Sequence, residues 1–339
     1  MSEVRSTLLM LGALGLLFAL FGVALMIGSA PISPNEVWAS LVAPHELEPW
    51  KRAVVIDIRM PRVLLGAICG GGLAVAGATM QGMFRNPLAD PGILGVSAGA
   101  SFGAVLVLYL APLGWTAAGV PLGAFVGGLA AAFWVYRLAS ERGDAAITTL
   151  LLAGIAVGGI ASALTSLVLS LSLAEWEVGR QMLTWLMGGL DDRGWGHVAI
   201  ATPTVLGGAI LLLIYGRDLN ILSTGEETAM ALGVDARRVK RELIFLVALV
   251  TGATVAVMGV VGFVGLIIPH IVRQLQGPEH RRLLPLSFAL GAVFLVSADI
   301  FCRWLVHTDL RLGVVSALAG GPFFLALLIK HRRAQGASS

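Results

Sequence analysis

The sequence carries little charge for its length. Only 13% of its 339 residues are Asp, Glu, Lys or Arg, whereas 57% are hydrophobic. A soluble domain usually carries about 25% charged residues, and a fold of this size has too small an interior to bury so much apolar surface. The composition therefore excludes a soluble globular protein and indicates a polytopic membrane protein. The net charge of +3 arises from loop arginines and gives no reason to expect nucleic acid as a partner.

Disulfide, metal and nucleotide motifs are also missing. Cys69 and Cys302 are the only cysteines, and both lie in or beside apolar runs without metal-ligand spacing. We therefore expect them to pack in the core and predict neither a disulfide nor a metal site. The chain has no P-loop, dinucleotide fingerprint, nucleophile elbow or H-E-x-x-H sequence. We expect no catalytic residue, no cofactor bound by the chain itself and no enzyme activity of its own.

Long apolar runs are abundant. A bilayer core requires roughly 20 apolar helical residues, and eight runs of about this length lie at 7–28, 63–82, 93–111, 117–136, 147–173, 197–215, 284–301 and 312–330. The first run is too long for a signal-peptide core and is expected to be retained. A ninth run, 243–272, contains a glycine cluster that predicts a tight turn near Gly259 and hence two spans. The prediction is an all-α membrane protein with about ten transmembrane helices in one domain, 1–339.

A charged island interrupts the apolar sequence at residues 217–242, RDLNILSTGEETAMALGVDARRVKRE. With an even number of spans, both termini lie on one side. Most of the 23 Lys and Arg residues then fall on that side, because the island and the tail KHRR (330–333) are both basic. Positively charged loops favour the cytoplasm, so we predict cytoplasmic termini and a cytoplasmic island.

Within this island, residues 225–234 are typical of a short amphipathic helix bounded by glycines. Two interpretations are open from the residues alone. The segment is either a docking helix for a cytoplasmic partner or a solvated loop.

Ionisable residues are scarce inside the spans. Asp299 is the main one, and it precedes Arg303 by four residues, which places the two on one helical face where they can pair. A buried pair in a membrane indicates a functional site, but neutralisation or positioning of Arg303 explains Asp299 better. Proton-coupled carriers usually place several Asp, Glu or His residues along their path. Because this chain lacks such a series, we expect another source of energy.

The histidines are scattered. Only His270, directly after Pro269, lies within an apolar run. A hydrogen-bonded structural histidine explains it better than a ligand does.

Four arginines are predicted on the outer side. Arg59 and Arg62 precede the second span, and Arg303 and Arg311 flank the loop before the last one. Outer arginines oppose the usual orientation bias and therefore need a reason. Either they complement an acidic protein partner, or they reach lipid phosphates at the interface.

Several long motifs occur together in this chain. They are IRMPRVLLGAICGGGLAVAGATMQGMFRNPLADPGILGVSAGA (58–100), ALGV (231–234), GFVGLIIPHIVRQLQGPEHRRLLP (262–285), AD at 298–299 followed by Arg303, and GGPFFLALL (320–328). In this order they resemble the permease subunits of FecCD-type, or type II, ABC importers over nearly the whole chain. That family imports iron chelates, haem or cobalamin.

The resemblance implies a homodimer with the substrate path along its twofold axis. It also implies two cytoplasmic subunits that bind and hydrolyse Mg-ATP, and a periplasmic substrate-binding protein. The location implied is the bacterial inner membrane, among lipids. The island then contains the coupling helix that contacts the ATPase, and Arg59, Arg62 and Arg303 match positions that meet acidic residues of the binding protein. Arg311 stands where relatives often have proline and is a candidate for an additional basic contact. The coupling residues implied are Gly225, Glu226, Glu227, Ala229, Ala231, Leu232 and Gly233. Asn86, Pro87, Pro269, His270 and Asp299 are candidates for structural or pathway roles.

The substrate is less strongly indicated than the machinery. The form MQGMFRNPLADPG is most similar to haem permeases of the family, so haem is the expected substrate, with a ferric siderophore second and cobalamin third. One departure affects the last outer loop, because this chain has Asp309-Leu310-Arg311-Leu312-Gly313 where relatives often have Glu-Leu-Pro-x-Gly. The alternative of another class is a secondary transporter driven by an ion gradient.

Overall fold

The computed structural model describes residues 2–336 except 44, 46, 111–115, 141–146, 173–174 and 306–309. All regular structure in these residues is helical. The α-helices that form the body of the protein are α1 (Ser2–Met26), α4 (Met60–Met83), α5 (Val96–Leu110), α6 (Thr116–Ala139), α7 (Ile147–Ser172), α8 (Trp176–Leu186), α9 (Trp195–Ala201), α10 (Gly207–Ile214), α13 (Ala236–Met258), α14 (Val264–Gln276), α15 (His280–Trp304) and α16 (Leu312–Gly336).

Shorter elements complete the chain. They are α2 (Pro34–Val42), α3 (Pro49–Ala53), α11 (Gly216–Leu222), α12 (Glu226–Ala231), the π-helical turns η1 (Val54–Arg59) and η3 (Thr202–Leu206), and the 3₁₀ turn η2 (Pro91–Leu94).

The predicted spans agree with the helices. Among the described residues, seven helices are long and apolar enough to cross a membrane, and Val96–Leu110 and Leu312–Ala326 are shorter apolar helices. The prediction of a multi-span all-α fold is confirmed. The long run 243–272 is divided as predicted, because α13 ends at Met258 and α14 begins at Val264. Gly259 adopts a φ of +73° between them, a conformation that glycine tolerates far better than other residues.

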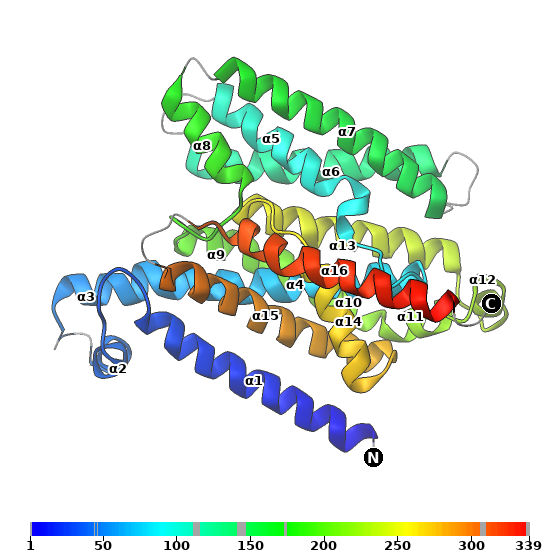
Figure 1. Cartoon of the computed structure of the whole chain (residues 1–339), viewed down its shortest axis with the longest axis horizontal. Helices are drawn as coiled ribbons and strands as arrows, with labels where there is room; N and C mark the ends of the chain where they lie inside the picture. The colour runs from blue at the N-terminus through cyan, green and yellow to red at the C-terminus, as the bar shows by residue number, and fades with distance from the viewer. Residues whose placement is uncertain are drawn as a thin grey trace.

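The helices form two groups (Figure 1). Helices α5, α6, α7 and α8 pack together on one side, and α4, α13, α14 and α15 form the centre of the other. Helix α6 and helix α5 contact α13 across the boundary between the groups. Inside the second group α4 and α15 approach so closely that a side chain on Gly70 would collide with the backbone of Gly291. Close backbone contact of this kind is how transmembrane helices gain packing energy in lipid.

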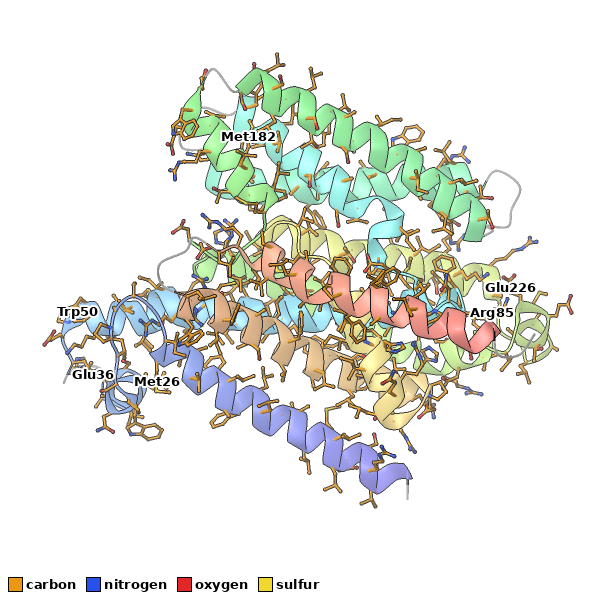
Figure 2. All side chains as sticks on the ribbon, in the orientation of Figure 1. Met26, Glu36, Trp50, Arg85, Met182 and Glu226 are labelled. Carbon is orange, nitrogen blue, oxygen red and sulfur yellow. The ribbon has the colours of Figure 1, made fainter. Side chains whose placement is uncertain are left out.

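The two ends of the molecule differ in what they carry. Helix α1 begins and α16 ends at the same end as α12 (Figure 1), in agreement with termini on one side. Figure 2 places Arg85 and Glu226 at this end and Met26, Glu36 and Trp50 at the opposite one. We call the end with α12 the cytoplasmic end, as the charge distribution predicts, and the opposite end the outer end.

Candidate functional site

The four predicted outer arginines lie together. Arg59, Arg62, Arg303 and Arg311 line one cavity of about 390 Å³ at the outer end. They come from the end of η1, the start of α4, the end of α15 and the residue before α16. We call these four residues the outer arginine cluster.

Arg59 is held against the end of α1. It is only 5% exposed, and it donates hydrogen bonds to the carbonyl oxygens of Leu25, Met26 and Ala30 at 2.7, 2.9 and 2.5 Å. The last carbonyls of a helix have no partners within the helix and carry its partial negative charge. The guanidinium therefore caps α1 and fixes it to α4.

Arg303 also caps α1. Its Nη1 donates to the carbonyl oxygens of Ala24 and Ile27 at 2.7 and 2.8 Å. Its Nε lies 3.0 Å from Asp299 Oδ2, which confirms the pair predicted from their spacing. Neither atom of this ion pair makes a well-aligned hydrogen bond, so the contact is mainly one of opposite charges.

A chain of ion pairs extends from Asp299 across the cluster. Arg62 donates through Nε to Asp299 Oδ1 at 2.8 Å and through Nη1 to Asp191 Oδ1 at 2.7 Å. Arg311 Nη1 donates to Asp191 Oδ2 at 2.8 Å. Asp299 is 2% exposed, and two guanidinium groups neutralise it, as a buried carboxylate requires. Asp309, the acid of the altered loop, lies outside the described residues, whereas the arginine of that loop is a member of this chain of pairs.

Asp191 was not identified from the sequence. It lies in the turn 187–194 between α8 and α9, and its partners are 129 and 120 residues away along the chain. Burial alone would raise the pKa of Asp191, but Arg62 and then Arg311 outweigh burial and hold that pKa below its usual value. The carboxylate is therefore ionised at neutral pH.

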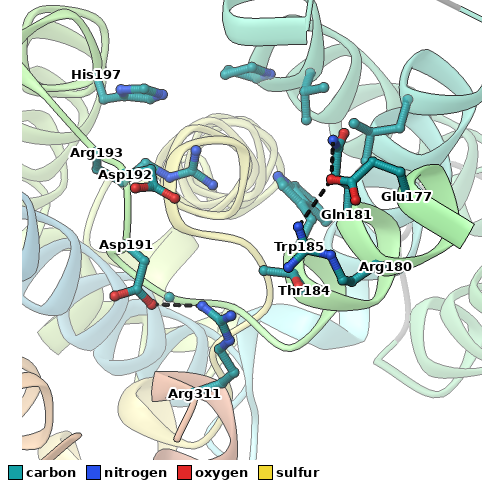
Figure 3. A pocket seen from close by; sticks show the side chains of 14 residues that line it. Glu177, Arg180, Gln181, Thr184, Trp185, Asp191, Asp192, Arg193, His197 and Arg311 are labelled. Atoms are coloured by element: carbon teal, nitrogen blue, oxygen red, sulfur yellow. Dashed lines mark hydrogen bonds and ion pairs between the residues drawn. The ribbon is translucent and has the colours of Figure 1, made fainter. Parts of the chain in front are cut away.

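The Asp191–Arg311 pair also lines a second cavity (Figure 3). It has a volume of about 490 Å³, and Asp191 and Arg311 line it as well as the first cavity. Helix α8 contributes Glu177, which binds Arg180 and Gln181. Asp191 and Arg311 thus line both cavities at the outer end.

The cytoplasmic end carries a short exposed helix, α12. Glycines in positive-φ conformations flank it, Gly225 at +122° and Gly233 at +81°. The predicted glycine-bounded helix is confirmed, but it ends at Ala231, before the predicted limit at Val234. Ala229 is fully buried, and Lys240 binds Glu226. These two contacts hold α12 against the start of α13.

Two large apolar side chains are exposed at the end of α12 and directly after it. Met230 is 60% exposed and Leu232 is 63% exposed, while the other predicted coupling residues Glu226, Glu227, Ala231 and Gly233 are exposed around them. Met230 was not singled out from the sequence, although its place between the glycines would have indicated it. Exposed apolar side chains at a polar end of the molecule are typical of a protein contact.

The remaining predicted residues lie in separate places. Asn86 and Pro87 form the turn after α4, where Asn86 Oδ1 accepts a hydrogen bond from the Leu88 amide at 2.9 Å. Pro269 is buried inside α14. His270 lies edge-on to Phe323 of α16, with ring centroids 5.9 Å apart, and bonds Gln274. The structure does not bring these residues to Asp299, and it favours the interpretation of His270 as a structural histidine.

Comparisons with known proteins agree with this architecture. The model of the FecCD transport family matches residues 16–330. The cobalamin import system permease protein BtuC of Halobacterium salinarum is 46% identical over 277 residues, which cover 82% of this chain and 73% of that protein. The hemin transport system permease protein HmuU of Yersinia pestis is 38% identical over 330 residues, 96% of each chain. A solved structure of a metal-chelate type ABC transporter in an inward-facing conformation superimposes with a TM-score of 0.84 at 31% identity. The superposition covers 95% of this chain and 98% of the transporter chain.

Proposed function

The chain belongs to the FecCD transport family of ABC importer permeases, and from this premise we propose that it translocates haem across the bacterial inner membrane. In this proposal it works as a homodimer. Separate ATPase subunits bind and hydrolyse Mg-ATP at the cytoplasmic end, and a periplasmic substrate-binding protein docks at the outer end.

The scarcity of buried charged groups supports the proposal that the energy for transport comes from a separate ATPase. Within the part of the chain that the structure describes, the buried side chains that are charged or histidine are Arg59, Asp299 and His280. Arg59 and Asp299 lie at the outer end, in capping bonds and ion pairs, and His280 begins α15 near the cytoplasmic end. No series of titratable groups connects the two ends through these spans, which disfavours a proton-driven carrier.

Helix α12 supports the proposed coupling to an ATPase. Its exposed Met230 and Leu232 give an apolar contact surface, and buried Ala229 with the Glu226–Lys240 pair fixes that surface to α13. A force applied to α12 is therefore transmitted to a long helix in the centre of the molecule. Such a rigid link is what conversion of ATP hydrolysis into movement of the spans requires.

The outer arginine cluster supports docking of an acidic partner. Four guanidinium groups line one cavity, and Asp191 and Asp299 are the carboxylates that contact them. The positive excess attracts carboxylates of a partner and steers their approach. Arg59 is committed to α1, so we propose that it contributes attraction at a distance. Arg62 and Arg311, at 15% and 20% exposed, are the more accessible members of the cluster, and we propose that they contact the partner.

The choice of haem rests on the form MQGMFRNPLADPG and on a hemin permease that is 38% identical over 96% of both chains. Permeases named for ferric citrate and for vitamin B12 match over a similar share of both chains, so coverage does not choose among the substrates. Cobalamin moves ahead of a ferric siderophore to become the second candidate, because the 46% identical relative is named for it. A ferric siderophore is the third.

The test is reconstitution of the chain with its ATPase and binding protein in nanodiscs, followed by ATPase measurements. We expect haem-loaded binding protein to stimulate hydrolysis more than the protein loaded with cobalamin or a ferric siderophore. Stimulation by cobalamin alone would reject haem and keep the importer function. Absence of stimulation by any loaded binding protein would contradict the proposed machinery.

A further inference from the structure

The two carboxylates of the outer arginine cluster differ in exposure. The side chain of Asp299 is 2% exposed, whereas that of Asp191 is 41% exposed. The arginines they bind are mostly covered, at 15% for Arg62 and 20% for Arg311. Asp299 is therefore a built-in counter-ion, and Asp191 lies over the arginines at the surface.

Asp191 occupies one terminal nitrogen of each arginine that an incoming carboxylate can reach. Its two oxygens accept one hydrogen bond from Arg62 and one from Arg311. These two arginines are also the members of the cluster that a partner can reach, because Arg59 is 5% exposed and Arg303 is 10% exposed. A partner carboxylate that binds these Nη1 groups therefore competes with Asp191 for them.

The turn that carries Asp191 is bound to two other segments. The Gly189 amide donates to the Met258 carbonyl at 2.7 Å, and the Gly313 amide approaches the Gly188 carbonyl at 3.5 Å. Side chains on Gly188, Gly259 or Gly313 would collide with the neighbouring backbone. The turn 187–194 thus joins the end of α13 to the start of α16, and it follows α8 directly.

We propose that Asp191 is an internal competitor for the outer arginine cluster. It binds Arg62 and Arg311 while no partner is docked, and a carboxylate of the substrate-binding protein replaces it, which releases the turn 187–194. This inference rests on the proposed function. In this inference, docking replaces the ion pairs of Asp191 with those of the partner and thereby frees the turn to move. The turn is bound to α13 and α16 and follows α8, so docking of the binding protein affects these three helices.

The proposal predicts the sign of a mutational effect. When an internal group occupies part of the binding site, a partner binds only while the site is free. The apparent Kd then equals the intrinsic Kd divided by the fraction of time that the site is free. Removal of the Asp191 charge frees both arginines, so docking should become tighter. A role in which Asp191 only positions the arginines predicts the opposite sign.

The experiment compares Asp191→Asn with Asp192→Asn in the permease–ATPase complex in nanodiscs. Both variants remove one negative charge from the same turn, but Asp192 makes no ion pair with any described residue. We expect Asp191→Asn to lower the Kd of the substrate-binding protein about threefold to tenfold relative to Asp192→Asn, from the usual strength of two partly exposed ion pairs. Asp191→Glu, which keeps the charge, should return the Kd towards the wild-type value.

Hydrogen exchange of the Gly189 amide gives a second measurement. We expect docking to accelerate this exchange in the wild type, and Asp191→Asn to show fast exchange without a partner. Equal or weaker docking by Asp191→Asn than by Asp192→Asn would overturn the inference while the importer function stands. Failure of the wild type to bind the substrate-binding protein would overturn both.

Discussion

The outer and cytoplasmic ends of this permease present opposite kinds of surface. At the outer end, Arg62, Arg311 and Asp191 already bind one another. At the cytoplasmic end, Met230 of α12 and Leu232 directly after it are exposed, with no apolar cover among the described residues. An end whose charges are paired internally must exchange partners when it binds, so its contacts suit a partner that comes and goes. An end with a preformed apolar surface suits a partner that remains bound.

The largest effect should come from the buried carboxylate of the outer end. Asp299→Asn keeps the shape of the side chain but leaves Arg303 without its acidic neighbour and Arg62 with only Asp191. Loss of one member of a buried ion pair costs about 3–5 kcal/mol. We expect a fall of this size in the free energy of unfolding, measured by denaturant titration in detergent.

Asp192→Asn is the control for this variant, because it removes an exposed acid from the same end and should change stability by less than about 0.5 kcal/mol. Equal stability of the two variants would show that Asp299 is not the counter-ion that holds the cluster.

The next largest effect should come from the apolar surface of α12. Met230→Glu places a charge in the proposed contact with the ATPase. Side chains at the centre of an interface typically contribute 2 kcal/mol or more, so we expect ATPase affinity to fall about 30-fold. Pull-down of the ATPase from detergent measures this, with Met230→Leu as the control that keeps the apolar bulk. Retention of the ATPase by Met230→Glu would place the coupling contact elsewhere.

A smaller effect should distinguish capping from docking within the cluster. Arg59→Met removes three hydrogen bonds to the end of α1, and we expect it to lower stability by about 2 kcal/mol. Docking of the substrate-binding protein should weaken by less than about threefold at physiological salt. Arg59 acts on the partner only at a distance, where salt screens the attraction.

Arg52→Met, on α3, removes the same charge from an exposed position and should leave stability unchanged. A loss of docking by Arg59→Met with full stability would instead show that Arg59 contacts the partner.

The sequence predicted what depends on neighbours along the chain. Gly259 was identified as the break between two spans because glycine permits the conformation found there. Asp299 and Arg303 were paired because four residues make one helical turn. The short helix of the charged island was predicted because glycines mark its two ends in the sequence.

Contacts between distant segments were not predictable in this way. The bonds of Arg62 to Asp299 and Asp191 join residues 237 and 129 positions apart, and they follow from how α4, α15 and the turn 187–194 pack. The capping of α1 by Arg59 was missed because a lone arginine before a span has no periodic partner. The helix α2 was also missed, although Ser33 and Glu36 form a capping box that is readable in the sequence.

The most direct test of the central claim is haem uptake into proteoliposomes that contain the complete complex. The account predicts accumulation that requires ATP, persists in the presence of an uncoupler and disappears with Met230→Glu. Uptake that proceeds without ATP and collapses on addition of the uncoupler would contradict it.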